Sequence, residues 1–194
     1  MKNNNPDVLK RFVSKGVFPY QYAFTLLIPL RNIFLSPKQL INRLMLKENY
    51  TVLEIGPGPG YFSIKIAKEL SKGKLVLADI QQKMLDYARK RIEKKGLKNV
   101  EFKLCSGETL DFENDYFDRV FMVTVIGEIE KKDEYLKEIY RVLKKGGILS
   151  ISELAGDPDK IEKEDLRELI EPKGFKLTHQ FGSNKNYTLN FTKI

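Results

Sequence analysis

The chain has 194 residues, of which 42% are hydrophobic and 31% are charged, with one cysteine and one histidine. That length suits one domain, or one domain with an arm, and the apolar fraction is too high for a disordered chain. One cysteine excludes a disulfide framework, and one cysteine with one histidine argues against a zinc-type site, so we predict no metal. The first residues do not resemble a signal peptide, and we expect a reducing, cytoplasmic setting.

The net charge of +8 is concentrated in the first quarter of the chain. Residues 1–47 hold eight lysines and arginines against the single acid Asp7, which leaves residues 48–194 almost neutral. We predict a basic, apolar N-terminal helical arm or lid at 1–47 and a separate domain at 48–194. A nearly neutral domain argues against nucleic acid as a partner.

The predicted arm is rich in aromatic and apolar residues. Its most apolar stretch, Val17 to Leu30, is shorter than the roughly 20 residues that a spanning helix needs. Three interpretations stay open: the arm packs on the sheet edge over a cofactor, it covers an apolar acceptor pocket, or it makes a peripheral contact with an anionic membrane.

From Tyr50 onward, strand-like and helix-like segments alternate along the chain. Period-two and helical spacing predict strands at 51–55, 75–79, 100–104, 119–123 and 148–152, and helices at 61–71, 82–95, 133–144 and 163–171. A turn at 144–147 should end the third of these helices. Residues 175–181 and 187–193 flank a polar turn and predict an antiparallel hairpin. The alternation indicates an α/β fold with a doubly wound parallel sheet, which the hairpin makes mixed.

A glycine-rich loop, Gly56-Pro57-Gly58-Pro59-Gly60, follows the first predicted strand. Its third glycine comes one position too early for the dinucleotide fingerprint, and no G-K-[ST] follows as in a P-loop. Pro57 and Pro59 also remove two of the N–H groups on which a phosphate cradle depends. A ligand that lacks phosphate and carries positive charge fits better, and S-adenosylmethionine is such a ligand.

Two carboxylates stand at the ends of the first two predicted strands. Glu54 is placed to orient an ammonium group, directly or through water. Asp79 follows Gly60 by nineteen residues and is placed to accept hydrogen bonds from both hydroxyls of a ribose. Hydrogen bonds to a charged acceptor contribute roughly 1.5 to 3 kcal/mol each, so Asp79 should matter for affinity.

Three segments resemble the motifs of a known family. Val52 to Gly60 resembles the first motif of the class I S-adenosylmethionine-dependent methyltransferases, and Phe117 to Val120 with Tyr140 to Gly147 resemble later signatures of their menaquinone/ubiquinone-biosynthesis type subgroup. The resemblance covers about residues 48–194. It implies a Rossmann-like, doubly wound, seven-stranded mixed sheet in the order 3-2-1-4-5-7-6. It specifies the cofactor and leaves the acceptor open.

The resemblance also implies a set of site residues. The cofactor-binding residues that it implies are Glu54, Ile55, Gly56, Gly58, Gly60, Asp79, Ile80, Ser106, Gly107, Glu108 and Thr124. Ser106 stands where the subgroup often has an acid for the adenine amino group, so a hydroxyl or the backbone must make that contact. The sequence assigns no catalytic base; the candidates are Glu128, Tyr20 and Tyr22, and Glu128 is equally well explained as a surface acid.

The predicted function is methyl transfer from S-adenosylmethionine to a small, partly apolar acceptor, by in-line displacement beneath an N-terminal lid. One alternative is a lipid or quinone methyltransferase at a membrane surface. Another is a binding module that keeps the cofactor without turnover.

Overall fold

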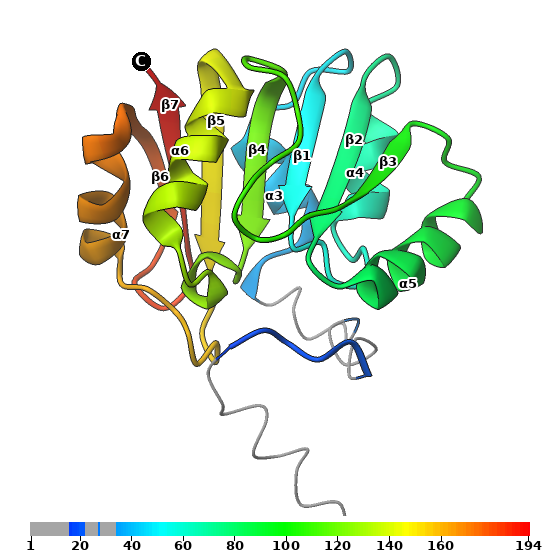
Figure 1. Ribbon diagram of the computed structural model, residues 1–194, viewed down its shortest axis with the longest axis horizontal. Helices are drawn as coiled ribbons and strands as arrows, with labels where there is room; N and C mark the ends of the chain where they lie inside the picture. The colour runs from blue at the N-terminus through cyan, green and yellow to red at the C-terminus, as the bar shows by residue number, and fades with distance from the viewer. Residues whose placement is uncertain (1–15, 22–26, 28–33) are drawn as a thin grey trace, which may run out of the picture.

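The computed structural model describes residues 16–21, 27 and 34–194, and a seven-stranded sheet forms its centre (Figure 1). The strands are β1 (Thr51–Ile55), β2 (Lys74–Asp79), β3 (Val100–Leu104), β4 (Phe117–Val123), β5 (Leu143–Glu153), β6 (Phe175–Gly182) and β7 (Tyr187–Lys193). They lie in the order β3-β2-β1-β4-β5-β7-β6, and β7 runs antiparallel to both of its neighbours. This order confirms the predicted fold class, including the mixed sheet.

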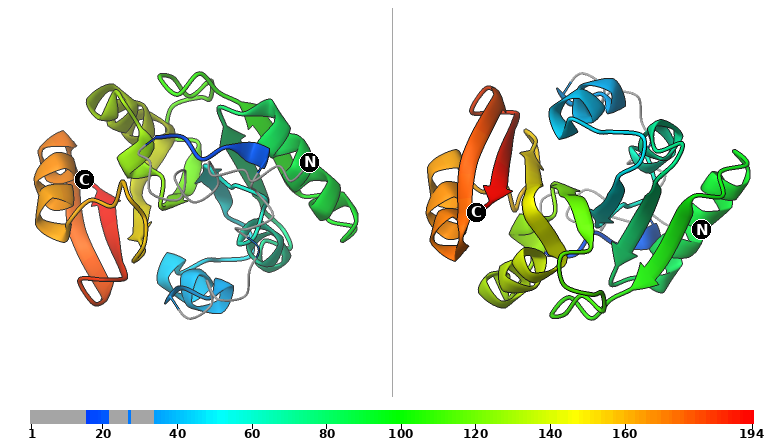
Figure 2. Two further views of the ribbon diagram at one scale, coloured as in Figure 1. Left: turned by 90° about the horizontal axis from the view of Figure 1, so that it is seen from below. Right: turned by 90° about the horizontal axis from the view of Figure 1, so that it is seen from above.

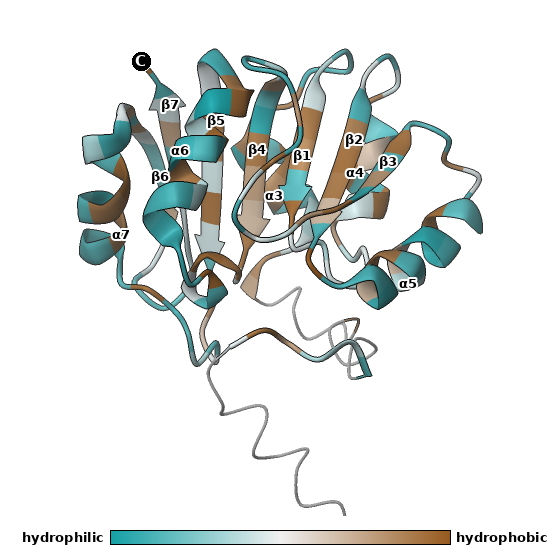
Figure 3. Ribbon diagram, viewed as in Figure 1, coloured by the Kyte–Doolittle hydropathy of each residue, from teal (hydrophilic) through white to brown (hydrophobic). Residues whose placement is uncertain are grey.

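Helices cover both faces of the sheet. They are α3 (Pro37–Leu44), α4 (Ser63–Glu69), α5 (Gln82–Glu93), α6 (Lys132–Val142) and α7 (Lys163–Ile170), with short 3-10 turns η2 (Ile126–Glu128) and η3 (Glu171–Lys173). One hydrophobic cluster joins the sheet to α6 and α7, and a second joins it to α3, α4 and α5. The central strands therefore contribute apolar residues to both faces, as a covered parallel sheet requires. Hydrophobic residues accordingly colour much of β2 and β4 in Figure 3.

Helix α3 lies in the predicted arm and starts with a capping box. The Ser36 hydroxyl accepts from the backbone N–H of Gln39, and the Gln39 side chain accepts from the backbone N–H of Ser36. At the other end, Arg43 donates to the Thr188 hydroxyl at 2.7 Å, and its carbonyl accepts from the Asn190 amide at 2.7 Å. These bonds tie α3 to β7 as part of the layer behind the sheet in Figure 1.

The turn predicted at residues 144–147, after α6, is wrong, because these residues belong to strand β5. Strand β5 begins at Leu143, directly after the helix, and the following residues belong to the strand. Phe117 pairs with Leu143 whereas Arg119 pairs with Ile148, so the intervening residues form a bulge. Gly146 supplies the positive φ of +74° that the bulge needs. The glycine signal marks an irregularity inside a strand here, because sheet pairing with β4 begins as soon as the helix ends.

The carboxyl ends of β1, β2, β4 and β5 meet at one edge of the sheet, the lower edge in Figure 1. The strand order reverses between β1 and β4, and ligands of open α/β sheets bind in the crevice outside such a point. Residues 16–21 run across this edge, as the view from below shows (Figure 2).

The turn between β1 and α4 depends on its glycines. Gly56, Gly58 and Gly60 all have positive φ, at +63°, +54° and +75°. A Cβ atom on Gly56 would lie only 2.6 Å from a methyl carbon of Val125, in the segment after β4. The turn therefore brings β1 and β4 close together at the crevice, and only glycine fits at its first position.

Gly56→Ala should lower the free energy of unfolding by roughly 2–5 kcal/mol, because strain at positive φ adds to overpacking against Val125. Gly146→Ala is the matched control, since its φ is +74° and no atom lies within 4 Å of the added carbon. That control should lose only the strain, roughly 1–2 kcal/mol. Urea denaturation of both variants measures the difference, and equal losses would contradict the overpacking.

Candidate functional site

A cavity of about 700 Å³ opens at the carboxyl edge of the sheet. Its walls are the ends of β1, β2 and β4, the loops after β3 and β5, and residues 16–19. The predicted residues that line it are Glu54, Ile55, Gly56, Gly58, Asp79, Ile80, Ser106, Gly107, Glu108, Thr124 and Glu128. The structure thus brings most of the predicted set, dispersed over 75 positions of sequence, to one cavity.

Three of the predicted site residues are not among the described residues that line the cavity. A Cβ on Gly60 would contact the methyl group of Ala88 at 3.5 Å, so this glycine faces α5 and allows the helix to approach. The Tyr20 hydroxyl accepts from Lys83 at 3.1 Å, and the Lys83 nitrogen lies 4.7 Å from the ring centroid. Tyr22 lies outside the described residues.

Glu54 is the last residue but one of β1 and has an exposed fraction of only 2%. The hydroxyl of Ser63, at the start of α4, donates to its carboxylate at 2.6 Å. Burial raises the pKa of Glu54 to about 8, and the Ser63 hydrogen bond opposes that rise. The carboxyl is held in one orientation at low dielectric, where the arrival of a positive charge would ionise it.

Asp79 is the last residue of β2 and is also buried. Its carboxylate accepts from the backbone N–H of Gln81 at 2.9 Å, which fixes the start of α5 against the strand end. Burial raises the pKa of Asp79 to about 6, and the N–H groups of Gln81 and Ile80 oppose the rise. Ile80 beside it is 45% exposed and presents an apolar side chain to the cavity. A charged acceptor beside an apolar wall suits a ribose with its attached base.

Residues 16–19 form a strap over the cavity, held by main-chain hydrogen bonds. The N–H of Gly16 donates to Asp159 at 2.8 Å, in the loop after β5. The backbone of Phe18 donates to the Glu128 carboxylate, and its carbonyl accepts from the Gln81 amide at 2.8 Å. The strap therefore connects three walls of the cavity (Figure 2).

Glu128 lies in η2, just after β4, and faces the cavity. Burial, together with the charges of Asp157, Asp159 and Asp79, raises its pKa to about 7, while the Phe18 backbone hydrogen bond opposes the rise. Glu128 is thus a half-buried acid near other acids, as a residue that exchanges a proton or binds a cation would be. Thr124, between β4 and η2, has a φ of +55°, a strained conformation for a β-branched residue at the cavity wall.

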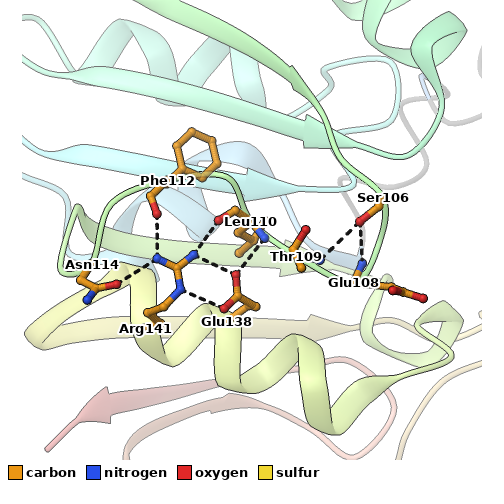
Figure 4. Close-up of polar contacts among 8 residues, drawn as sticks. All are labelled: Ser106, Glu108, Thr109, Leu110, Phe112, Asn114, Glu138 and Arg141. Atoms are coloured by element: carbon orange, nitrogen blue, oxygen red, sulfur yellow. Dashed lines mark hydrogen bonds and ion pairs between the residues drawn. The ribbon is translucent and has the colours of Figure 1, made fainter.

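The loop after β3 is latched to α6 by one arginine (Figure 4). Arg141 donates to the carbonyls of Leu110 and Phe112 at 2.6 Å and 2.7 Å, to Asn114 at 3.0 Å, and to both oxygens of Glu138 at 2.8 Å. The planar guanidinium satisfies all these acceptors at once. It thereby fixes the far end of the loop whose near end supplies the predicted adenine contacts.

Within the same loop, Ser106 folds the chain back on itself. Its hydroxyl accepts from the N–H groups of Glu108 and Thr109 at 3.3 Å and 3.4 Å (Figure 4). The hydroxyl stands at the cavity wall, where the sequence predicted that a hydroxyl or the backbone replaces an acid.

Several lining residues were missed by the sequence interpretation. They are Gln81, Cys105, Tyr135, Asp157 and Asp159, whereas Phe18 and Phe34 belong to the apolar arm that the sequence predicted over the cofactor or the acceptor. The strand pattern would have indicated the two aspartates, because every loop after a parallel strand opens at the same edge. Tyr135 gave no such signal, since its spacing on α6 is that of an ordinary core residue.

A model of the methyltransferase domain family matches residues 46–189. The ubiquinone/menaquinone biosynthesis C-methyltransferase UbiE of Hydrogenovibrio crunogenus is 36% identical over 106 residues, which are 54% of this chain and 42% of the relative. The UbiE of Marinomonas sp. is 32% identical over 133 residues, 68% of this chain and 51% of the relative. The chain spans about half the length of the curated relatives that it matches.

A solved structure is similar over almost the whole chain. A SAM-dependent methyltransferase from Aquifex aeolicus superposes with a TM-score of 0.86 and 23% identity, covering 92% of this chain and all of the other. That likeness shows the fold. With the family match, it places the chain in the class I S-adenosylmethionine-dependent methyltransferases, as a member of the methyltransferase domain family. The predicted family and its cofactor are confirmed.

The residues present fit that cofactor. S-adenosylmethionine carries a sulfonium and an ammonium but no phosphate, and the cavity offers buried carboxylates with a turn too poor in N–H groups for phosphate. The glycine turn, into which a side chain would not fit, permits close approach of a ligand to the backbone.

The hydrogen bonds of Arg141 lead to a prediction about stability. Arg141→Lys keeps the charge but loses the planar fork, so it should lower the free energy of unfolding by roughly 2–3 kcal/mol and speed amide exchange in residues 105–116. Arg167→Lys is the control, because Arg167 makes one exposed ion pair with Glu171 at 3.5 Å and should lose less than roughly 0.5 kcal/mol. Equal effects of the two variants on stability and exchange would contradict the latch.

The burial of Glu54 predicts how the free energy of unfolding depends on pH. Its folded-state pKa of about 8 lies above the roughly 4.3 of an unfolded glutamate, so the folded state holds a proton that the unfolded state releases. Stability from this group is complete below the unfolded value and is lost as the pH rises through the folded value. Glu54→Gln should therefore resemble wild type near pH 4 and exceed it at pH 8, by up to roughly 5 kcal/mol, in ligand-free denaturation.

The control for this pH dependence is Glu48→Gln. Glu48 is exposed, and its hydrogen bond with Lys72 lowers its pKa. Its contribution therefore has the opposite sign, and Glu48→Gln should gain no stability at high pH. A gain in both variants would show that overall charge, and not burial of Glu54, causes the effect.

Proposed function

We propose that the chain transfers the methyl group of S-adenosylmethionine to a small, partly apolar acceptor bound in the same cavity. The observation that supports this most directly is the cavity itself. Glu54 and Asp79, near the ends of two strands, line the same cavity as a set of apolar residues. When bound, the cofactor supplies a methyl group on a sulfonium that leaves as a neutral thioether.

The cofactor-side roles follow from where each side chain lies. Glu54 would bind the ammonium beside the glycine turn, and Asp79 would accept from the ribose hydroxyls with Ile80 against the base. Ser106 and Gly107 lie in the loop that would hold the adenine. Because the thioether needs no acid to leave, the main tasks of the chain are to align the acceptor with the methyl group and to exclude water.

We further propose that the strap is part of a lid over the acceptor. Val17, Phe18 and Phe34 line the cavity and contribute apolar surface to it. Gln81 donates to Phe18 and is itself held by Asp79 through its N–H. Gln81 therefore connects the proposed lid to Asp79, the residue proposed to bind the ribose. Lid closure and cofactor binding should for that reason favour each other. Glu128, beneath the strap, is the candidate base.

A second candidate, a quinone-type acceptor at a membrane surface, is favoured by the names of the curated relatives. Among the described residues no helix is long and apolar enough to cross a bilayer. Co-sedimentation with vesicles of anionic phospholipid distinguishes this candidate, which predicts salt-sensitive binding. Formation of S-adenosylhomocysteine with any member of an acceptor panel distinguishes the proposed enzyme from a module that binds the cofactor without turnover.

The cofactor roles are tested by titration calorimetry with S-adenosylmethionine, S-adenosylhomocysteine and NAD. Wild type should bind the first two and not NAD. Asp79→Asn should weaken binding by roughly 10- to 150-fold, because hydrogen bonds to a charged acceptor contribute roughly 1.5 to 3 kcal/mol. Asp86→Asn on the outer side of α5, where Asp86 accepts from Gln82, should change nothing. NAD binding without S-adenosylmethionine binding would overturn the proposal.

A further inference from the structure

The two edge strands of the sheet, β3 and β6, differ in regularity. The pairing of β6 with β7 is interrupted by a bulge between Leu177 and His179. A bulge protects an edge strand, because it bends the unpaired side out of a regular ladder. Strand β3 pairs with β2 without interruption from Val100 to Leu104, and no other strand of the described chain pairs with its outer side. This end of the sheet therefore presents a regular, unpaired edge (Figure 1).

The main-chain groups on the outer side of β3 belong to its even-numbered residues. The N–H of Cys105 donates to the carbonyl of Asp79 at 3.0 Å, and the carbonyl of Asn99 accepts from the N–H of Leu75 at 3.0 Å. Because the direction of these groups alternates along a strand, the odd-numbered residues face β2. The outward N–H and C=O groups are therefore those of Val100, Phe102 and Leu104. No group of the described chain is hydrogen-bonded to them on that side.

The side chains of β3 read the same in both directions of the chain. Val100, Phe102 and Leu104 are apolar and share one face of the sheet, whereas Glu101 and Lys103 share the other. The acid Glu101 and the base Lys103 stand symmetrically about Phe102. A reversed copy of the strand therefore places an apolar residue opposite each apolar residue and a base opposite each acid.

An antiparallel second copy of β3, related by a two-fold axis at Phe102, satisfies this edge. Phe102 would lie opposite Phe102 of the second copy and Val100 opposite Leu104, and each such pair exchanges two main-chain hydrogen bonds. Glu101 would lie opposite Lys103 of the second copy at a non-hydrogen-bonded position, where the Cα atoms approach to about 4.5 Å and the side chains interact most closely. All five residues find a matching partner in this one register.

The charged face of the edge would gain an ion-pair network in this arrangement. Within one chain, Lys74 lies 2.7 Å from Glu101, and Lys103 lies 2.5 Å from Asp111. Both pairs are on the surface, where single ion pairs contribute little. Across the two-fold axis, Lys74 and Glu101 would be followed by Lys103 and Asp111 of the second copy, so that the charges alternate in sign.

The apolar face of the edge is only partly covered by its own chain. Leu104 is 50% exposed, and the guanidinium carbon of Arg89, on α5, lies 4.2 Å from the centroid of the Phe102 ring. Asp86 and Glu93 lie three and four positions from Arg89 and so share its side of α5. This side of α5 carries charges of both signs, and it therefore does not exclude a second copy by like-charge repulsion.

We infer that the chain forms a symmetric dimer in which two copies of β3 pair antiparallel and join the two sheets into one. The partner that fits this surface is thus a second copy of the same chain. The dimer does not depend on the proposed methyl transfer. An interface built on one pair of short strands lies at the low end of interface areas, so its Kd should be on the order of micromolar.

Charge-reversed variants test the pairing by sedimentation velocity of the full chain, from about 1 to about 500 µM, a range that spans the expected Kd. At the upper end, wild type should have twice the 22.5 kDa mass of the chain. Lys103→Glu sets two acids opposite two acids, and Glu101→Lys sets bases opposite bases, so each should raise the Kd at least about tenfold. Lys176→Glu, at an exposed position of β6, is the control and should leave the Kd within about twofold.

Mixing the two β3 variants separates pairing across the edge from a loss of stability. One variant offers only acids at the edge and the other only bases, so an equimolar mixture should dimerise about as tightly as wild type although neither variant does so alone. A wild type that stays monomeric over the whole range leaves the edge to a different partner and overturns the inference. A dimer that neither reversal weakens, or a mixture as dissociated as its components, overturns it as well.

Amide exchange of wild type tests the same pairing without any substitution. The outward N–H groups of Val100, Phe102 and Leu104 should exchange slowly in the dimer and quickly on dilution below the Kd. Those of Glu101 and Lys103 face β2 and should exchange slowly in both conditions. Mass spectrometry with electron-transfer fragmentation resolves the alternate residues, and fast exchange of the outward groups at every concentration would contradict the dimer.

Discussion

Carboxylates largely withdrawn from water at one edge of a parallel sheet are the constraint on which the rest of this molecule depends. Glu54 and Asp79 lie at strand ends and Glu128 follows a third strand, and burial raises the pKa of each. Such groups reduce the stability of the ligand-free protein at neutral and alkaline pH. A bound cation would offset that effect, so under the proposed roles the same feature that weakens the fold would contribute binding energy for a positively charged cofactor.

Three structural elements around the cavity fix the positions of these carboxylates. The glycine turn brings β1 against the segment after β4, with Gly56 packed on Val125. Arg141 fixes the loop after β3 by donating to the backbone carbonyls of Leu110 and Phe112, which lie away from the part of the loop that lines the cavity. The strap closes the remaining side through main-chain hydrogen bonds. Each part acts on the geometry of the site from a different segment, which suits a reaction whose rate depends mainly on alignment.

The strands, the hairpin and most of the helices could be predicted because their patterns are local. The run from Thr51 to Ile55 and the hairpin from Phe175 to Lys193 were placed within a residue of their observed bounds. Asp79 could be predicted as a site residue because a parallel strand that ends in an acid presents it at the edge where ligands bind. The turn at 144–147 was misplaced because a lysine–glycine run indicates a helix end equally well whether a loop or a bulged strand follows.

The sequence by itself determined the fold class, the strand ends and the kind of ligand that the glycine loop excludes, since hydrophobic periodicity and backbone preference act between near neighbours. Only the tertiary structure decided which charges share the cavity. Gly16 meets Asp159 across 143 positions, and Phe18 meets Gln81 across 63. The burial that shifts Glu128 likewise comes from segments remote from it in sequence. A carboxylate's pKa and partners depend on distances through space, and the packing of the whole chain determines those distances.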